Sequence, residues 1–220
     1  TSDSSIDNGG LLYVTNNGGD LDMNGKVTNR GDKTQIVNTG ANANVAGSID
    51  NAKDLVIANN GSGALTVSAG IENGNDASIY NAGTDATITS TMRNGRNLVV
   101  TNEGSGNLLV DGDITNGANA NIINGSKAND LTLSGSFTNG NDLVVRSGGR
   151  GDMLVDGTID NKNDIELSNA GRNMSISGTV DNGNNLTAIN NGSGAMSVSG
   201  RINNGATAEI TNNGSGLEVS

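Results

Sequence analysis

The chain contains no cysteine, proline, histidine or tryptophan among its 220 residues. Without cysteine it has no disulfide framework and no thiol chemistry, and without histidine it lacks the commonest metal ligand and general base. The absence of proline excludes collagen and proline-rich linkers, although 34 residues are glycine. Aromatic residues are limited to two tyrosines and one phenylalanine, so any core must be mainly aliphatic.

Positive charge is also scarce, because 12 lysines and arginines face 23 acidic residues and the net charge is −11. The basic residues form no cluster, which argues against nucleic acid and anionic membranes as partners. No apolar run approaches the roughly 20 residues that a membrane span needs, and no signal peptide is visible at Thr1. We therefore expect no nucleic-acid partner and no insertion into a membrane.

What the chain has is one repeat of 21 to 23 residues, which recurs about ten times. A repeat this short buries its apolar side chains only by stacking on its neighbours, so the pattern predicts a solenoid. We expect residues 1–220 to form one continuous body, and to be a piece of a longer array. The repeats start at Ile6, Val27, Ile49, Ile71, Met92, Ile114, Phe137, Ile159, Val180 and Ile202.

Within a repeat, apolar residues alternate with polar ones over short stretches, as at Leu55 and Ile57 or at Leu65 and Val67. This alternation is typical of strands with one buried face, and the Asn-Gly and Ser-Gly pairs between the stretches favour sharp corners. The sequence thus predicts an all-β fold: a single-stranded parallel β-helix of about ten rungs, with three short strands per rung. We expect right-handed coiling by analogy with parallel crossover connections. A leucine-rich horseshoe has a similar period, but its helical half is missing here.

Two asparagine positions are more uniform than the apolar ones, and their parity places them on the buried side of the strands. A buried amide is costly unless it is hydrogen-bonded, so we expect the amides of successive rungs to form ladders. The first column comprises Asn8, Asn29, Asn51, Asn73, Asn94, Asn116, Asn139, Asn161, Asn182 and Asn204. The second comprises Asn16, Asn38, Asn59, Asn81, Asn102, Asn124, Asn169, Asn190 and Asn212, with Ser147 in the seventh repeat.

Two Arg-Gly-Asp tripeptides fall at predicted corners, at Arg30, Gly31 and Asp32 and at Arg150, Gly151 and Asp152. Because corners are exposed, these tripeptides are candidate contacts for an integrin-type receptor. The competing interpretation is ordinary turn composition in a chain rich in glycine and aspartate.

Other chemistry is weakly represented. Residues 148–153 resemble a fragment of the calcium-binding β-roll nonapeptide, but the period differs, so we expect no cofactor and keep calcium at acidic corners as a minor alternative. Paired carboxylates such as Asp111 and Asp113 could serve glycoside chemistry, but no corner is long enough to wall a cleft. Ice binding needs threonine in the same outward slot of every rung, and those slots are mixed. We therefore expect no enzymatic activity.

The consensus Ile-x-Asn-Gly-Asn-Asp-Leu-x-Val-x-Asn-x-Gly-Ser-Gly-x-Leu-x-Val-x-Gly resembles the repeat regions of filamentous-haemagglutinin-like exoproteins, which use two-partner secretion. It looks particularly like the Asn/Gly-rich arrays of fusobacterial leukotoxin-like large exoproteins. The resemblance implies a right-handed β-helical stalk outside the cell, with adhesion or toxin delivery carried by distal regions.

These observations predict a structural and adhesive segment of a secreted or surface-exposed bacterial exoprotein, located outside the cell. Its main partners would be flanking repeats of the same chain. One alternative is a module that binds a host surface protein or glycan through its exposed corners. Another is self-association into a filament, because the open end rungs carry unpaired strand edges.

Overall fold

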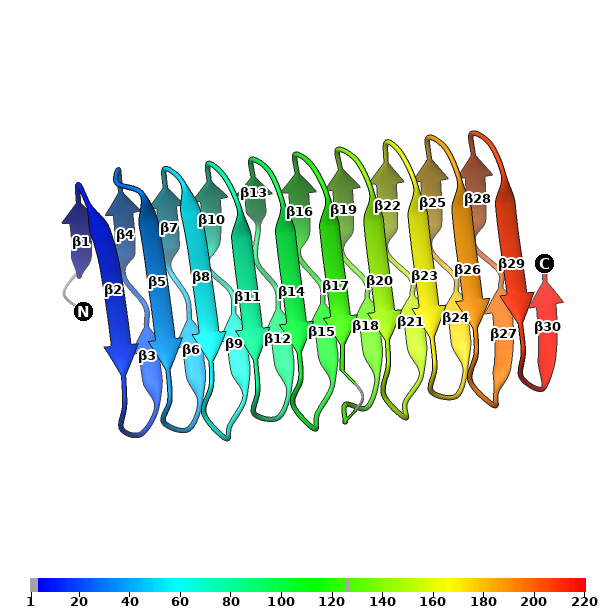
Figure 1. Ribbon diagram of the computed structural model, residues 1–220, viewed down its shortest axis with the longest axis horizontal. Coiled ribbons are helices and arrows are strands. Elements are labelled where there is room, and N and C mark those ends of the chain that lie inside the picture. Colours follow the sequence, from blue (N-terminus) through cyan, green and yellow to red (C-terminus); the bar gives the residue numbers. More distant parts are fainter. Residues whose placement is uncertain (1–3, 126) are drawn as a thin grey trace.

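The computed structural model describes residues 4–125 and 127–220. Every regular element in these residues is a β-strand, and the strands stack as successive rungs along the long axis of the molecule (Figure 1). Each rung contributes one strand to each of three parallel ten-stranded sheets. The predicted parallel β-helix of about ten rungs with three strands per rung is confirmed.

The first sheet contains the repeat starts and the first asparagine column. Its strands, in spatial order, are β1 (Ser5–Asn8), β4 (Lys26–Asn29), β7 (Ser48–Asn51), β10 (Gly70–Asn73), β13 (Met92–Asn94), β16 (Asp113–Asn116), β19 (Ser136–Asn139), β22 (Thr158–Asn161), β25 (Thr179–Asn182) and β28 (Arg201–Asn204).

The second sheet ends each of its strands at the second asparagine column. Its strands are β2 (Leu11–Asn16), β5 (Lys33–Asn38), β8 (Asp54–Asn59), β11 (Ala77–Asn81), β14 (Leu98–Asn102), β17 (Ala120–Asn124), β20 (Leu143–Ser147), β23 (Ile165–Asn169), β26 (Leu186–Asn190) and β29 (Ala208–Asn212).

The third sheet has the shortest strands, with one outward side chain in most of them. Its strands are β3 (Leu21–Met23), β6 (Ala43–Val45), β9 (Leu65–Val67), β12 (Ala86–Ile88), β15 (Leu108–Val110), β18 (Leu131–Leu133), β21 (Met153–Val155), β24 (Met174–Ile176), β27 (Ala195–Val198) and β30 (Gly216–Val219).

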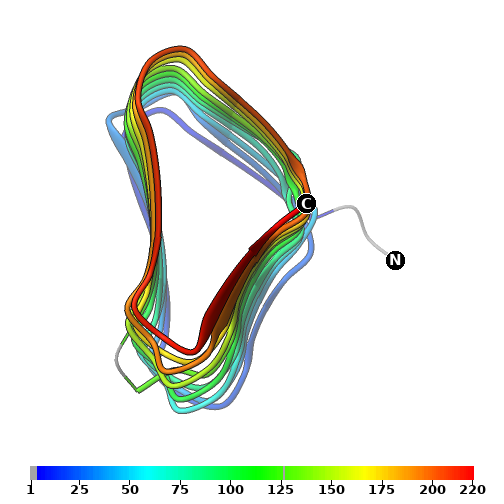
Figure 2. The same cartoon turned by 90° about the vertical axis from the view of Figure 1, so that its right-hand side faces the viewer.

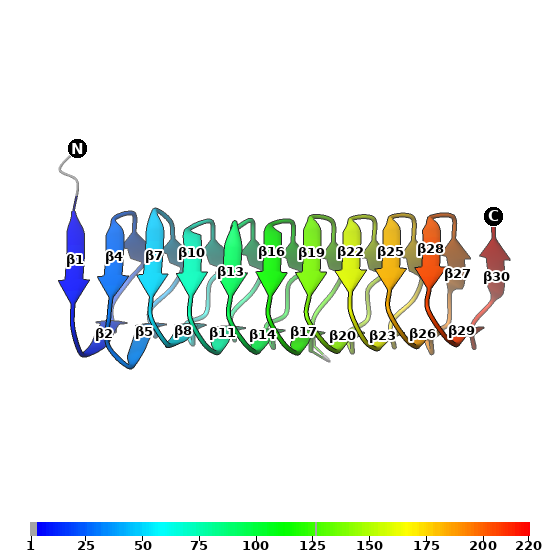
Figure 3. The same ribbon diagram turned by 90° about the horizontal axis from the view of Figure 1, so that it is seen from above.

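The rungs are stacked in register, so equivalent residues of successive repeats lie directly above one another. Ile49 pairs with Ile71, and Ile71 pairs with Met92. Seen from the C-terminal end, the chain turns counterclockwise as it approaches the viewer, which makes the coil right-handed (Figure 2). The sheets form the three sides of a triangular section, and Figure 3 shows the same stacking from above.

The interior of the triangle is one continuous aliphatic core that receives side chains from all three sheets. Ile49, Leu55 and Leu65, one from each sheet, are each 1 % exposed. Phe137 is equally buried, as its inward parity predicts, whereas Tyr13 is 60 % exposed. Because each fully buried side chain of this size contributes about 1.5–3 kcal/mol, the stacked columns supply the main driving force for folding. No helix in the described residues is long and apolar enough to cross a membrane.

Close stacking makes glycine necessary at the corner between the second and third sheets. Gly83 lies two residues after Asn81, and a Cβ built on it would sit 1.9 Å from the carbonyl oxygen of Gly63. A side chain at this position would therefore displace the preceding rung. Gly70, at the start of β10, is different, because nothing lies within 4 Å of a Cβ built on it.

Candidate functional site

The first asparagine column forms an unbroken ladder along the inside of the corner between the first and second sheets. From Asn8 to Asn204, each Nδ2 donates to the Oδ1 of the equivalent asparagine one rung further on, at 2.6 to 3.3 Å. Asn94 is representative: its Nδ2 also donates to the carbonyl oxygen of Asn97 at 2.8 Å. Asn29, Asn73, Asn116, Asn161 and Asn182 make the equivalent hydrogen bond to the backbone of their own corner. The ladder thus joins neighbouring rungs and, in these rungs, also ties the corner together.

The second asparagine column forms a similar ladder that is interrupted once. Amide-to-amide hydrogen bonds run from Asn16 to Asn124 and again from Asn169 to Asn212. Ser147 lies between the two runs, and its buried Oγ has no hydrogen-bond partner among the described residues. Asn124 instead donates to the carbonyl oxygens of Asn129 and Asp130, at 3.2 and 2.9 Å.

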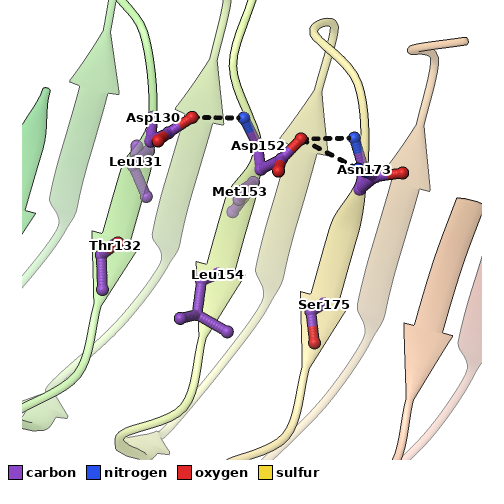
Figure 4. Close-up of a pocket in the computed structure, with 8 residues that line it drawn as sticks. All are labelled: Asp130, Leu131, Thr132, Asp152, Met153, Leu154, Asn173 and Ser175. Carbon is purple, nitrogen blue, oxygen red and sulfur yellow. Dashed lines mark hydrogen bonds between the residues drawn. The ribbon is translucent and has the colours of Figure 1, made fainter. Parts of the chain in front are cut away.

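Two further columns, not predicted from the sequence, lie at the positions that precede the strands of the second and third sheets. Asp152, before β21, accepts hydrogen bonds on Oδ1 from the backbone N–H and the Nδ2 of Asn173, at 3.0 and 3.1 Å (Figure 4). Asp164, before β23, accepts the same pair of hydrogen bonds from Asn185, both at 3.0 Å. These two aspartates therefore bind the backbone and the side chain of the equivalent residue in the next rung.

The first Arg-Gly-Asp tripeptide lies at an exposed corner, but each of its charged side chains pairs with a neighbouring rung. Arg30 contacts Asp7 of the preceding rung at 2.6 Å, and Asp32 contacts Lys53 of the following one. The hydrogen bond from Lys53 to Asp32, reinforced by their charges, raises the pKa of Lys53. Both pairs are exposed and screened by solvent, so they add little to stability, and a receptor could replace them at little cost.

The second tripeptide is more buried between neighbouring rungs than the first. Arg150 is exposed, but Gly151 is buried, and a Cβ on it would lie 2.3 Å from the Oδ1 of Asp130. Asp152 is half-buried, serves the next rung as described above, and lies 3.4 Å from the Nε of Arg172. The expected exposure therefore holds for Arg150 but not for Gly151.

Two adjoining depressions surround this corner. One, of about 310 Å³, lies over the third sheet, where Thr132, Leu154 and Ser175 point outward on neighbouring strands (Figure 4). The other, of about 490 Å³, is polar and is lined by Asn107, Asn129, Asp130, Arg150, Gly151 and Arg172. Asp130 borders both depressions. Their amide, carboxylate and guanidinium groups could bind a peptide or the hydroxyl groups of a sugar.

The chemistry available at these depressions is recognition by hydrogen bonds and charge. Among residues 4–125 and 127–220, no three histidine, cysteine or acidic side chains gather closely enough to hold a metal ion. Asp111, one of the carboxylates considered for glycoside chemistry, accepts a hydrogen bond from the Oγ of Ser134 at 2.8 Å on the outside of the coil. The most regular polar feature of the described residues is thus the pair of asparagine ladders, together with the two columns that precede the strands of the second and third sheets.

The chain matches no protein-family model, no curated protein and no solved structure. What the geometry establishes is a β-solenoid of about ten turns with asparagine ladders.

Proposed function

We propose that this chain is a structural stalk segment of a large secreted or surface-exposed bacterial exoprotein, an adhesin or toxin of the filamentous-haemagglutinin-like kind, without catalytic activity of its own. One observation carries the proposal: ten rungs of 21 to 23 residues stack in register with no long insertion at any corner. Enzymes built on solenoids use long corner loops to wall a cleft, whereas a stalk needs length and uniformity.

The pattern of contacts supports this proposal. Each rung pairs only with the rungs before and after it, so the chain can fold one rung at a time as it emerges from an export pore. The absence of cysteine removes the risk of wrong disulfides outside the cell. Polar ladders join the rungs at the corners, in a chain that has no cysteine for disulfides.

Localisation in the organism that encodes the chain tests the proposal. Antibodies raised against the folded protein should label intact cells or the culture supernatant, and protease added to intact cells should remove the cell-bound signal. A signal confined to the cytoplasmic fraction would rule out the extracellular stalk.

End-to-end self-association is a second candidate function, favoured by a specific observation at the last rung. The Nδ2 of Asn204 is buried and has no hydrogen-bond partner in the described residues, whereas every earlier amide of its column donates to the next rung. A further rung stacked on this end would supply the missing acceptor, either from a flanking repeat of the same chain or from Asn8 and β1 of a second copy. Rods that lengthen with protein concentration in electron micrographs would support this candidate, and particles of one length at all concentrations would argue against it.

A receptor- or glycan-binding role is the third candidate, and the depressions that meet at Asp130 favour it. If the tripeptides bind an integrin-type receptor, Asp32→Glu or Asp152→Glu should abolish cell attachment while the far-UV circular dichroism is kept. Asp181→Glu, on the outward side of β25, is the matched control. Unchanged attachment in both tripeptide variants would remove them as receptor contacts.

A further inference from the structure

The chain contains the dipeptide Asn-Gly thirteen times, and the structure divides these dipeptides between two environments. In eight of them the asparagine belongs to a ladder: Asn8, Asn73, Asn94, Asn116, Asn124, Asn139, Asn182 and Asn204. In the other five the asparagine is exposed at a corner: Asn17, Asn24, Asn60, Asn191 and Asn213.

Asn-Gly is the dipeptide most prone to spontaneous deamidation, because glycine leaves its own backbone nitrogen unhindered. That nitrogen loses its proton and attacks the asparagine Cγ, a new C–N bond forms, and the side-chain nitrogen leaves as ammonia. Water then opens the resulting succinimide at either carbonyl, which gives aspartate or isoaspartate. The reaction needs a glycine N–H that is free to ionise and a carboxamide that can rotate onto it.

The ladder blocks both requirements, as Asn94 and Gly95 illustrate. The N–H of Gly95 donates to the carbonyl oxygen of Asn73 at 2.8 Å. The Oδ1 of Asn94 accepts from Asn73 at 2.7 Å, and its Nδ2 donates to Asn116 and to the carbonyl oxygen of Asn97, both at 2.8 Å. The side chain is only 4 % exposed. The carboxamide is therefore fixed, and rotation onto Gly95 would break three hydrogen bonds inside the core.

The corner dipeptides are held more loosely, because the hydrogen bonds that their asparagine side chains make are exposed. Asn24 donates to Asp22 at 2.7 Å, and Asn213 donates to Asn191 at 2.8 Å. Asn60 is exposed, and the N–H of Gly61 makes only a 3.3 Å hydrogen bond to the Oδ1 of Asn59. Asn191 is similar, because the N–H of Gly192 lies 3.2 Å from the Oδ1 of Asn190. These side chains can turn toward the glycine nitrogen without disturbing the core.

We propose that Asn17, Asn24, Asn60, Asn191 and Asn213 are deamidation sites of the folded protein and that the ladders protect the six Asn-Gly asparagines inside them, Asn73, Asn94, Asn116, Asn124, Asn139 and Asn182. Asn8 and Asn204, at the two ends of the first ladder, are half-buried and are not included in the protected group. At Asn60 an isoaspartate would insert an extra methylene into the backbone next to Gly61, where even an added Cβ would lie 2.2 Å from the carbonyl oxygen of Gly40 in the preceding rung. Modification would thus both add negative charge to the corner and loosen the stacking there.

The test is peptide mapping by mass spectrometry after incubation of the folded protein at mildly alkaline pH. The five corner asparagines should convert at least about tenfold faster than the six protected ladder asparagines, because a residue inside a ladder reacts only when its rung opens locally. The same incubation in urea is the control, and there the two groups should convert at similar rates. Equal rates in the folded protein, or corner asparagines that stay intact while the urea control reacts, would overturn the proposal.

Two variants sharpen the test. Asn60→Gln should abolish modification at this one corner and leave the rates at Asn191 and Asn213 unchanged. Asn94→Ser mimics the serine found naturally at position 147 and removes the acceptor of the Asn73 amide. Conversion of Asn73 should therefore accelerate in a protein that is still folded by circular dichroism, and an unchanged rate would contradict protection by the ladder.

Discussion

At the scale of single residues, the buried asparagines are the unusual feature of this molecule. A buried carboxamide is stabilising only when its oxygen and both of its N–H groups are hydrogen-bonded. Asn94 meets that condition because its amide bonds the previous rung, the next rung and its own corner. Hydrogen-bonded chains of this kind also strengthen one another by mutual polarisation.

Removal of one amide from the ladder should therefore cost more than the loss of a single hydrogen bond. Asn94→Ala leaves the Nδ2 of Asn73 without its acceptor and the Oδ1 of Asn116 without its donor. We expect the free energy of unfolding to fall by about 1–3 kcal/mol, measured by urea denaturation. Asn121→Ala, on the outward side of β17, is the control and should change stability by less than about 0.5 kcal/mol. Equal effects of the two substitutions would contradict the structural role of the ladder.

The interruption at Ser147 offers the reverse experiment. Ser147→Asn should join the two runs of the second ladder, because the new Nδ2 faces the Oδ1 of Asn169 and its Oδ1 faces Asn124. We expect a gain of about 1 kcal/mol in the free energy of unfolding. Ser147→Ala removes the same unpaired hydroxyl without adding an amide. If it stabilises the protein as much as asparagine does, the gain does not come from the ladder.

At the scale of elements, strands and corners follow from different sequence signals. The strands were predictable because apolar residues alternate with period two, as in Leu55 to Ile57, and because the same slots recur in every repeat. The asparagine ladders were predictable from recurrence together with parity. The two columns of aspartate and asparagine that precede the strands of the second and third sheets were not predictable, because the two residue types exchange freely there. Alanine also interrupts the pattern, at Ala64 before β9 and at Ala195, the first residue of β27.

The partners of the charged side chains at the Arg-Gly-Asp corners could not be predicted from the sequence either. A tripeptide at a corner looks the same whether its charges face solvent or the adjacent rung. Only the stacking register brings Arg30 to Asp7 and Asp152 to Asn173. The depressions around Asp130 depend on the same register, so they too could not be read from the repeat.

Corner geometry makes glycine substitutions sharply position-dependent. Gly83→Ala places a methyl group 1.9 Å from the carbonyl oxygen of Gly63, and we expect overpacking of this kind to cost about 1–3 kcal/mol. Gly70→Ala is the matched control, because nothing lies within 4 Å of its added Cβ. In thermal melting, the Gly83→Ala variant should have a clearly lower melting temperature than the Gly70→Ala variant. Similar melting temperatures would show that the corner at Gly83 has room for a methyl group.

At the scale of the whole molecule, the interior formed by residues 4–125 and 127–220 contains no side chain that titrates near neutral pH. The buried polar side chains of the described residues are asparagine, serine and threonine, and the chain has no histidine. The pKa values of Lys53 and Arg146 are raised, mainly by hydrogen bonds to Asp32 and Glu166.

Stability should therefore depend little on pH in the neutral range. A raised pKa on a cationic group contributes stability that is present at pH values below its unfolded pKa and is lost only as pH rises through the folded value. For lysine and arginine that loss falls in the strongly alkaline range. We expect urea midpoints to stay nearly constant from about pH 6 to pH 9, and a steep change within that interval would point to a titrating group in the core.

Distances between spin labels on the third sheet test the stacked-rung architecture most directly. Thr66, Leu154, Ser175 and Ser197 share one outward slot on β9, β21, β24 and β27, and the lack of native cysteine allows clean labelling of introduced pairs. Pulsed electron paramagnetic resonance should give distances from position 66 that grow linearly by about 4.8 Å per rung. They should reach about 29 Å at position 197, six rungs away. Distances that fail to increase steadily with rung number would contradict the in-register solenoid and, with it, the asparagine ladders.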